Sequence, residues 1–487
     1  MTEIVLTALH VTVAALLVAF ERRRPTATLS WVLAILLMPG VGLVLYLVVG
    51  RRRVDRRRRR AASVTARVSD LINEQGVRLG SAGVTDPRTE AMWRLGERLS
   101  ETPVSSGNRV ELIEDAEQTY ARMLAAVDMA SDHVHVQFYI YRDDTVGRVL
   151  RDRLAQKARE GLQVRVLVDA VGSAQLDDRF WDPLVDAGGE AAEFGPLWGG
   201  LDRFVRGGAV DLRNHRKLIV IDGREGFLGG MNVGREYWRG EPTLGAWRDA
   251  HMRIEGPAVL GMQESFVRDW LSSTGKLCSL PQFFPMPMAM PMAAGSATSE
   301  QSESTGAVVQ IVAAGPDQEF PALGPLYLQA IASARERVWI TTPYFVPTEP
   351  IEQCIATAAL RGVDVRLLVP ARADSRIVGW ASRSWFPSLV RAGVRIWTYE
   401  AGFIHAKTLL VDRWLAVVGS ANLDSRSFHL NYEINAFVYD AEFSETLERR
   451  FEGDLESSAE LPADQVLKPG VGRRLLLGAA RLLSPLL

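Results

Sequence analysis

The chain opens with two apolar segments separated by a short basic stretch. Residues 4–20 contain no charged residue and one histidine, His10. Residues 29–50 form a second uncharged run. A helix of roughly 20 residues crosses the hydrocarbon core of a bilayer, so the second run is long enough and the first is at the short end. A cleaved signal peptide fits poorly, because the charged residues follow the first apolar run instead of preceding it. We therefore expect residues 1–60 to form an α-helical membrane anchor.

Arginine clusters flank the second apolar run, at Arg22–Arg24 and within residues 51–60. The larger cluster predicts that the chain after residue 50 lies on the cytoplasmic side. A two-span hairpin would then place Arg22–Arg24 outside, against the same rule. A re-entrant hairpin, kinked near Pro39, would leave both clusters on one side. The sequence leaves both arrangements open.

From about Val110, helical and strand patterns alternate, and the same order returns later in the chain. The patterns predict helices at 116–130, 146–161, 321–334 and 351–361, and strands at 133–141, 164–169, 338–345 and 363–369. The stretch 159–168 also resembles the stretch 360–369 residue by residue. A repeat of about 200 residues is too long for a solenoid and indicates two homologous α/β lobes.

The repeat predicts the order of the parts that follow the anchor. We expect a helical connector over 61–105, a first lobe over 106–275, a linker over 276–306, a second lobe over 307–460 and a C-terminal segment over 461–487. The linker is rich in methionine, proline and serine, and binding of a soft metal by its methionines is the less favoured alternative.

The C-terminal segment is leucine-rich and carries Arg473, Arg474 and Arg481. On a helical wheel these three arginines fall within one arc of about 100°. A basic amphipathic helix of this kind can lie in a membrane interface. A helix packed on the second lobe, with a solvated basic edge, explains the pattern equally well.

Composition narrows the classes of function. The 487 residues include 56 Lys+Arg and 58 Asp+Glu, for a formal net charge of −2. This balance does not indicate a globally basic nucleic-acid-binding protein. The two cysteines, Cys278 and Cys354, are too few for a disulfide framework or a Cys-rich zinc site.

The pattern H-x-K-x4-D-x6-G-[GS]-x-N occurs twice, with the second copy 190 residues after the first. The residues it specifies are His215, Lys217, Asp222 and Asn232 in the first copy, and His405, Lys407, Asp412 and Asn422 in the second. In an extended strand the histidine and lysine of each copy point to the same face, because side chains alternate with period 2. Two such strands, one from each lobe, would place two imidazoles and two ammonium groups in one shared cleft.

These residue types suit chemistry at phosphorus. Two lysines and two asparagines offer charge and directed donors to a tetrahedral anion. Two histidines offer a nucleophile and a general acid/base. We predict that one histidine attacks phosphorus, giving a phosphohistidine, while the other protonates the leaving alcohol. No metal is required, and zinc would need more ligands than the pattern contains.

Each histidine also needs a carboxylate that fixes its tautomer. Asp249 follows His215 by 34 residues, and Glu433 follows His405 by 28. Because each acid lies on the stretch that returns after its own motif, we expect Asp249 to orient His215 and Glu433 to orient His405. Two surface acids are the alternative.

The duplicated pattern resembles the phospholipase D superfamily. Flanking stretches extend the resemblance to bacterial cardiolipin synthases over nearly the whole chain. They are Arg23-Arg24-Pro25-Thr26, Arg213–Lys217, Gly229–Tyr237, Thr342–Pro347 and Asn422–Phe428. The resemblance implies two homologous α/β lobes, each a mixed sheet flanked by helices, that share one active-site cleft.

The resemblance also implies an activity. A phosphatidyl group would pass from one phosphatidylglycerol to a hydroxyl of another, giving cardiolipin and glycerol. His215 would be the nucleophile and His405 the acid/base, although the near-symmetry of the motifs also permits the reverse. The phosphate oxygens would be held by Lys217, Lys407, Asn232 and Asn422. Asp222 and Asp412 would either act directly or cap donors at strand ends.

The expected partners are phospholipid substrates and the bacterial inner membrane, with the lobes on its cytoplasmic side. No cofactor, metal or nucleic acid is implied, and the sequence is silent on oligomeric state. A phospholipase that releases phosphatidic acid, or a transferase that uses phosphatidylserine or phosphatidylethanolamine, remains the alternative. The glycine-rich stretch 197–210 bears on substrate preference and not on reaction class.

Overall fold

The computed structural model describes most of the chain after residue 85 and short stretches before it. The described residues are 11–13, 16, 25–38, 40–46, 86–100, 102–113, 115–195, 212–278, 281–285, 306–318, 320–468 and 470–483. Two compact units are present, one formed by residues 1–57 with 201–209 and the other by residues 58–200 with 210–487. The arginine cluster at 51–60, the stretch 197–210 and residues 286–305 of the expected linker lie outside the described residues.

The first unit contains two short helices, α2 (Pro25–Leu37) and α3 (Val41–Leu45). Gly40 between them is the N-cap of α3 and has φ +82°, a conformation that glycine adopts without strain. A Cβ on Gly42 would lie 2.1 Å from the backbone oxygen of Ala34, so the two helices approach closely. The apolar run 29–50 is therefore interrupted near its middle.

The expected bilayer-spanning helices are not found in the described part of the chain. The 13 residues of α2 measure about 20 Å at 1.5 Å per residue, short of the roughly 30 Å hydrocarbon core. No other helix among the described residues is long and apolar enough to cross a membrane. Most of the expected first span, residues 4–20, lies outside the described residues.

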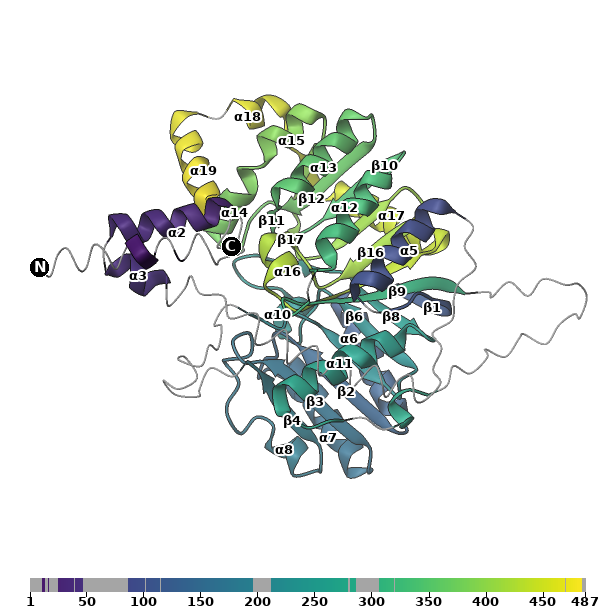
Figure 1. The fold of residues 1–487 in the computed structure, drawn as a ribbon. Coiled ribbons are helices and arrows are strands. Elements are labelled where there is room, and N and C mark those ends of the chain that lie inside the picture. Colours follow the sequence, from purple (N-terminus) through teal and green to yellow (C-terminus); the bar gives the residue numbers. More distant parts are fainter. Residues whose placement is uncertain are drawn as a thin grey trace, which may run out of the picture. The chain divides into compact units, whose positions relative to one another are not determined.

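Within its described residues, the second unit is built on one mixed sheet of 15 strands (Figure 1). The first half of the sheet runs outward from the centre as β1 (Ser105–Ile113), β8 (His251–Glu255), β6 (Glu225–Gly229), β5 (Leu218–Ile221), β2 (His133–Phe138), β3 (Gln163–Asp169) and β4 (Glu190–Phe194). The second half runs outward as β9 (Ala307–Ala314), β18 (Glu433–Tyr439), β16 (Leu415–Gly419), β15 (Thr408–Val411), β10 (Arg337–Thr341), β12 (Asp364–Pro370) and β13 (Arg395–Tyr399), with β19 (Ser458–Glu460) at the edge. The two halves thus repeat one strand order on either side of the antiparallel β1–β9 pair.

Helices cover both faces of this sheet. One face packs against α6 (Ala116–Met129) and α7 (Thr145–Arg159) in the first half, and against α12 (Leu323–Ser333) and α13 (Glu349–Leu360) in the second. The other face packs against α11 (Val259–Thr274) and α17 (Ala441–Glu456). The helix α5 (Pro87–Ser100) falls within the expected connector and buries Met92 in the second-half core.

The remaining helices are short or peripheral. They are α8 (Asp182–Val185), α10 (Arg235–Arg239), η2 (Pro281–Phe283), α14 (Arg376–Arg383), α15 (Phe386–Ala392), α16 (Ser425–His429), α18 (Ala463–Leu467) and α19 (Val471–Leu483). Aspartates begin several of the long helices: the Asp144 carboxylate, for example, accepts the backbone N–H groups of Val146 and Gly147 at the start of α7. Such caps satisfy donors that the first helical turn leaves open.

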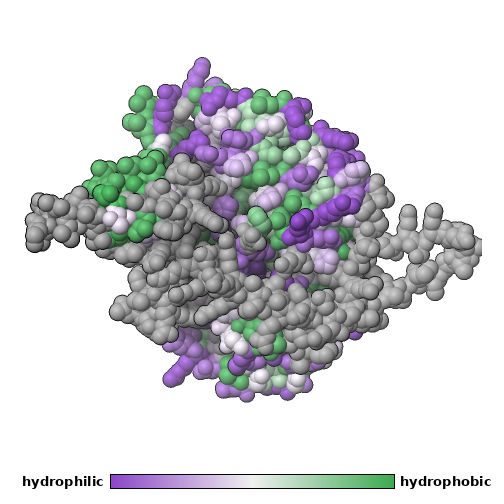
Figure 2. Space-filling view, viewed as in Figure 1, coloured by the Kyte–Doolittle hydropathy of each residue, from purple (hydrophilic) through white to green (hydrophobic). Residues whose placement is uncertain are grey.

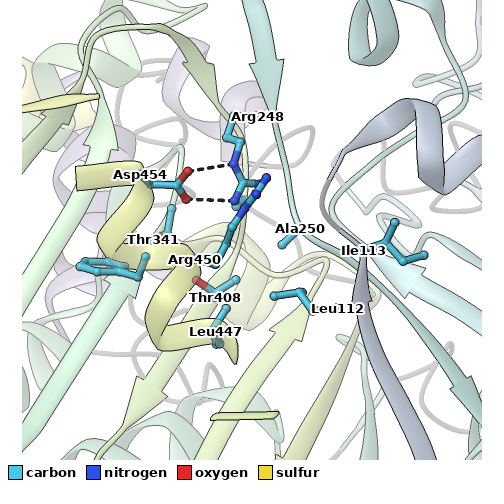
Figure 3. A pocket seen from close by; sticks show the side chains of 11 residues that line it. Leu112, Ile113, Arg248, Ala250, Thr341, Thr408, Leu447, Arg450 and Asp454 are labelled. Carbon is cyan, nitrogen blue, oxygen red and sulfur yellow. Dashed lines mark hydrogen bonds and ion pairs between the residues drawn. The ribbon is translucent and has the colours of Figure 1, made fainter. Parts of the chain in front are cut away.

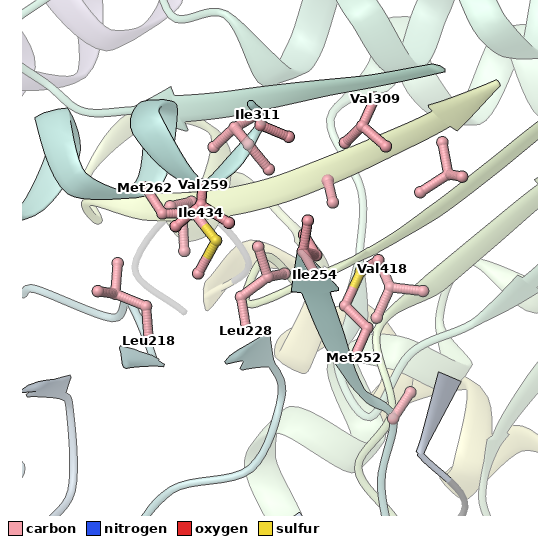
Figure 4. Packing of buried hydrophobic residues seen from close by; sticks show 14 of the residues in the cluster. Leu218, Leu228, Met252, Ile254, Val259, Met262, Val309, Ile311, Val418 and Ile434 are labelled. Atoms are coloured by element: carbon pink, nitrogen blue, oxygen red, sulfur yellow. The ribbon is translucent and has the colours of Figure 1, made fainter. Parts of the chain in front are cut away.

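The largest core is shared by the two halves. Figure 4 shows Leu218, Leu228 and Ile254 of the first half in one cluster with Val418 and Ile434 of the second. Burying each such side chain stabilises the fold by about 1.5–3 kcal/mol. The halves are therefore joined by apolar packing as well as by the central strand pair.

The predicted helices and most predicted strands agree with these bounds to within about three residues. The prediction of one strand over 338–345 is wrong, because β10 ends at Thr341 and the chain then leaves the sheet. Pro343 has no N–H to donate to a neighbouring strand. The rest of the predicted strand forms β11 (Phe345–Val346), which pairs with β17 (Leu423–Asp424) outside the main sheet.

Candidate active site

Two short parallel pairings cross between the halves and place the motif histidines. In the first, Asn214 pairs with Tyr432, and the His215 N–H donates to the Tyr432 carbonyl at 2.9 Å. In the second, β14 (Gly402–Ile404) pairs with β7 (Ala246–Arg248), and the His405 N–H donates to the Arg248 carbonyl at 2.7 Å. Each histidine is thus bonded to the residue that precedes the carboxylate of the other half.

The carboxylates accordingly pair with the histidines crosswise. His215 Nδ1 lies 2.9 Å from Glu433 Oε2, and His405 Nδ1 lies 2.7 Å from Asp249 Oδ2. The expected pairing of Asp249 with His215 and of Glu433 with His405 is therefore wrong. In the first half, β6 lies between the motif strand β5 and β8, which begins just after Asp249. In the second half, β16 lies between the motif strand β15 and β18, which begins at Glu433. The crossed pairings bring the two residues directly together.

Both imidazoles are buried among charged neighbours. Burial lowers the pKa of His215 to about 4 and that of His405 to about 3, with further lowering by the lysines and opposition from the paired carboxylates. Both rings are therefore neutral near pH 7. With its proton on Nδ1, each imidazole donates to its carboxylate and keeps the Nε2 lone pair available to react. His405 Nδ1 also lies 2.9 Å from Lys407 Nζ.

The carboxylates remain ionised despite their burial. Burial raises the pKa of Glu433, but His215 and Lys217 lower this pKa by more than burial raises it. The net pKa therefore lies below the ordinary value. Burial opposes ionisation of Asp249 in the same way, and Lys407 and His405 more than offset it. Two charged acids thus hold two neutral imidazoles at their Nδ1 atoms.

The motif lysines are buried beside the histidines. Lys217 Nζ donates to the carbonyl of His215 at 2.7 Å, and Lys407 Nζ donates to the carbonyl of His405. Burial lowers the pKa of Lys407 to about 8 and that of Lys217 well below its ordinary value. The crossed contacts of His215 with Glu433 and of His405 with Asp249 bring both motifs into one cluster.

The two motif asparagines have different surroundings. Asn232 Oδ1 accepts the Ile140 N–H at 3.0 Å, and its Nδ2 donates to the Tyr237 hydroxyl at 2.5 Å, which leaves a single Nδ2 hydrogen for a ligand. Asn422 Oδ1 is buried and has no hydrogen-bond partner among the described residues. A phosphate contact remains a prediction for both.

The motif aspartates lie at the far ends of the motif strands. Asp222 and Asp412 follow β5 and β15, each with φ +51°. The Asp222 carboxylate accepts the backbone N–H groups of residues 131, 132 and 133, and that of Asp412 accepts those of residues 335, 336 and 337. The structure therefore favours the capping alternative over a direct catalytic role for both aspartates.

We expect Asp222→Ala to destabilise the fold by about 2–4 kcal/mol, since it removes several backbone acceptors and leaves alanine in a left-handed conformation. Asp222→Asn should cost less, because asparagine tolerates that conformation and keeps one acceptor. Urea unfolding measures both losses. The turnover of the folded fraction should stay within a few-fold of wild type; a loss of a hundredfold or more would restore a catalytic role.

Glycines and a serine next to the motifs make room for the crossed carboxylates. A Cβ on Gly230 would lie 2.1 Å from Asp249 Oδ1, so only glycine fits there. At the equivalent position of the second copy, the Ser420 hydroxyl donates to Glu433 Oε2. The second position of the G-[GS] pair is therefore glycine where Asp249 leaves no room for a side chain, and serine where a hydroxyl donates to Glu433.

The sequence analysis missed Arg216, which lies between the motif histidine and lysine. Its guanidinium donates to Asp269 of α11 at 2.6 Å and to the carbonyls of Glu433 and Ala314 at 3.1 and 3.0 Å. Arg216 therefore fixes the first motif to both α11 and the second half. The difference between the two copies of the motif could have indicated Arg216. The first copy has an arginine between its histidine and lysine, where the second has the small Ala406.

A small cavity lies behind the second motif (Figure 3). Arg248 and Asp454 form an ion pair at its edge, with Nε–Oδ1 at 2.8 Å. Its volume of about 10 Å³ admits at most one water molecule. This space is too small for a lipid headgroup, and the ion pair instead fixes the residue whose carbonyl binds the His405 N–H.

The described part of the chain contains no cluster of three His, Cys, Asp or Glu side chains arranged to hold a metal ion. The arrangement found is instead two imidazoles, each bonded to one carboxylate, with a buried lysine beside each imidazole. Such a set can attack an electrophile with one Nε2, move a proton with the other, and stabilise negative charge.

Comparisons with known proteins agree on one family. A model described as "Cardiolipin synthase, PLD-like domain" matches residues 123–270 and 327–455, and one described as "Phospholipase_D-nuclease N-terminal" matches residues 11–51. Cardiolipin synthase 2 of Bacillus anthracis is 39% identical over 477 residues, covering 96% of this chain and 88% of the relative. The cardiolipin synthase of Halalkalibacterium halodurans is 37% identical over 485 residues, covering 99% and 93%.

Among solved structures, the phosphatidylserine synthase of Haemophilus influenzae is similar with a TM-score of 0.59. The match covers 81% of this chain and 100% of that one, at 14% sequence identity. At this identity the likeness establishes a shared fold and nothing about the substrate.

Proposed function

The chain belongs to the cardiolipin synthase family of the phospholipase D superfamily, and we propose that it converts two phosphatidylglycerol molecules into cardiolipin and glycerol. Enzymes of this family transfer phosphatidyl groups, and the matches to it extend over nearly the whole chain. The observation that carries the proposal is the crossed pair of neutral imidazoles, each held at Nδ1 by a carboxylate of the other half, beside two buried lysines.

In the first proposed step, His215 Nε2 attacks the phosphorus of one phosphatidylglycerol. A bond forms between phosphorus and Nε2, and the bond between phosphorus and the oxygen of the headgroup glycerol breaks. His405 gives the departing glycerol its proton. Lys217 and Lys407 offset the charge that develops on the phosphoryl oxygens. Glu433 stabilises the positive charge on His215 as it forms the covalent bond.

In the second step, a hydroxyl of another phosphatidylglycerol gives its proton to His405 and attacks the same phosphorus. The phosphorus–nitrogen bond breaks, so cardiolipin leaves and His215 is restored. The first step requires a protonated His405, whose pKa of about 3 in the ligand-free site leaves it neutral at pH 7. A phosphodiester anion bound between the lysines would counter their effect and raise this pKa.

We also propose that residues 1–60 hold the enzyme at the bacterial inner membrane, with the second unit on the cytoplasmic side. The uncharged runs and the arginine cluster that follows them support this placement. Both substrates are lipids, so a membrane-held site meets them at a high local concentration.

The test is incubation of the purified protein with vesicles of phosphatidylglycerol alone, with and without a chelator, followed by lipid mass spectrometry. We expect cardiolipin and glycerol in both samples, and neither from His215→Ala. Phosphatidic acid would make the protein a hydrolase. A product formed only after phosphatidylethanolamine or phosphatidylserine is added would assign a different lipid, and loss of product with the chelator would contradict a metal-free reaction.

The pH profile should report Lys407. Its pKa of about 8 means that the ammonium is charged below that pH and loses its charge above it. We expect kcat/KM to fall as the pH rises through about 8, because a neutral Lys407 no longer attracts the phosphodiester. Lys407→Arg keeps its charge at all these pH values and should remove the part of the falling limb that Lys407 contributes, leaving any part due to Lys217, whose pKa burial also lowers.

A further inference from the structure

The helix α19 has two apolar sides, and only one of them is packed. Leu477 and Ala480 are buried, whereas Val471, Leu475 and Leu482 are 76%, 72% and 82% exposed. At about 100° per residue, the three exposed positions fall within roughly 40° of one another, on the side of the helix opposite the two buried ones. The exposed residues therefore form one stripe.

The buried side of α19 attaches the helix to the second half. Ala480 packs with Val346 of β11 and Ala381 of α14. The Arg481 guanidinium lies over the Trp385 ring, 4.2 Å from its centroid. The stripe consequently faces outward because the opposite side is packed. Figure 2 colours hydrophobic residues green and hydrophilic residues purple, and both kinds are visible on the face of the molecule that it shows.

The charged residues within the two helices are all basic. Neither α14 nor α19 contains an aspartate or glutamate. Arg474 and Arg481 of α19 are exposed, and so are Arg376 and Ile377 at the start of α14. We call these exposed apolar and basic residues of the two helices the α14–α19 surface.

The α14–α19 surface is continuous with the second-motif side of the site. The helix α14 contacts β11, which pairs with β17 directly after Asn422. Tyr344 presents its ring edge to His405, with centroids 6.4 Å apart, and donates its hydroxyl to Asp374 just before α14. A surface that receives the α14–α19 surface would thus lie on the His405 side of the site.

We propose that the α14–α19 surface docks onto an anionic phospholipid surface. Leucines on one stripe enter the boundary between headgroups and acyl chains, while flanking arginines meet the phosphates, as in interfacial amphipathic helices. The arginines of α14 and α19, with no acid within either helix, favour an anionic lipid over a zwitterionic one. The identity of that lipid as phosphatidylglycerol rests on the proposed function, but the docking itself does not.

The first test is hydrogen exchange on full-length His215→Ala, which binds without turnover. We expect residues 471–483 to gain protection with vesicles of phosphatidylglycerol and not with vesicles of phosphatidylcholine. Equal protection without vesicles would mean that protein covers the stripe, and no protection with either vesicle would mean that lipid does not reach it. Either result overturns the proposal.

The second test compares Leu475→Glu with Leu360→Glu, because both leucines are 72% exposed on helices of the second half. Leu475→Glu should lower transfer on phosphatidylglycerol vesicles by about tenfold and leave transfer in detergent micelles unchanged. Leu360→Glu should change neither. Equal behaviour of the two variants on vesicles contradicts the docking surface, whereas protection without any cardiolipin product would sink the proposed activity alone.

Discussion

Given a phosphatidyl ester of p-nitrophenol, His405→Ala should release one equivalent of p-nitrophenol per enzyme and then stop, while His215→Ala should release none. This leaving group departs without a proton, so the first step does not need His405. The second step does, because the acceptor hydroxyl must lose its proton. The covalent phosphatidyl adduct on His215 should therefore accumulate and appear in the intact mass of the protein.

On phosphatidylglycerol itself both variants should be severely impaired. Loss of a general acid/base lowers turnover by about 10²–10⁴-fold, and loss of the nucleophile should leave no measurable transfer. A burst from His215→Ala with none from His405→Ala would reverse the assigned roles. A burst from both variants would contradict a covalent intermediate on either histidine.

The crossed carboxylates provide the second large effect. We expect Glu433→Gln and Asp249→Asn each to lower kcat by about 10²–10⁴-fold, because the amide no longer stabilises a charged imidazole or holds its Nδ1–H. The step affected should differ. Glu433→Gln should slow the burst, since Glu433 holds His215, and Asp249→Asn should keep the burst and slow turnover, since Asp249 holds His405.

Pairing within each half would give the opposite assignment, so this experiment separates the two arrangements. A matched control is the double variant His405→Ala/Asp249→Asn, which should be little worse than His405→Ala because the two residues act as a unit. His405→Ala/Glu433→Gln should instead be worse than either single variant. Additive losses in the first pair would argue that Asp249 does not act through His405.

Much of this arrangement could be predicted from local patterns. Alternating helix and strand periodicities indicated the α/β repeat, and the duplicated motif indicated which side chains would gather. The pairing of the carboxylates could not be predicted in this way, because distance along the chain does not say which strands become neighbours. Asp249 and Glu433 lie nearer in sequence to the wrong histidines.

The N-terminal segment shows a different limit. Its second apolar run is long enough to span a bilayer, yet α2 ends at Leu37 after 13 residues and the chain turns at Gly40, with φ +82°, before α3 begins. Hydropathy reports the burial that a segment favours, whereas local turn geometry decides where a helix stops. The roles of Asp222 and Asp412 were open for a similar reason, because the pattern lists residue types and does not say where each carboxylate points.

Because the pairing is crossed, the orientation of each histidine depends on the assembly of both halves. Neither half contains a complete histidine–carboxylate unit, so a chain in which one half has folded and the other has not holds no oriented nucleophile. Separating the two halves would therefore remove both histidine–carboxylate contacts at once.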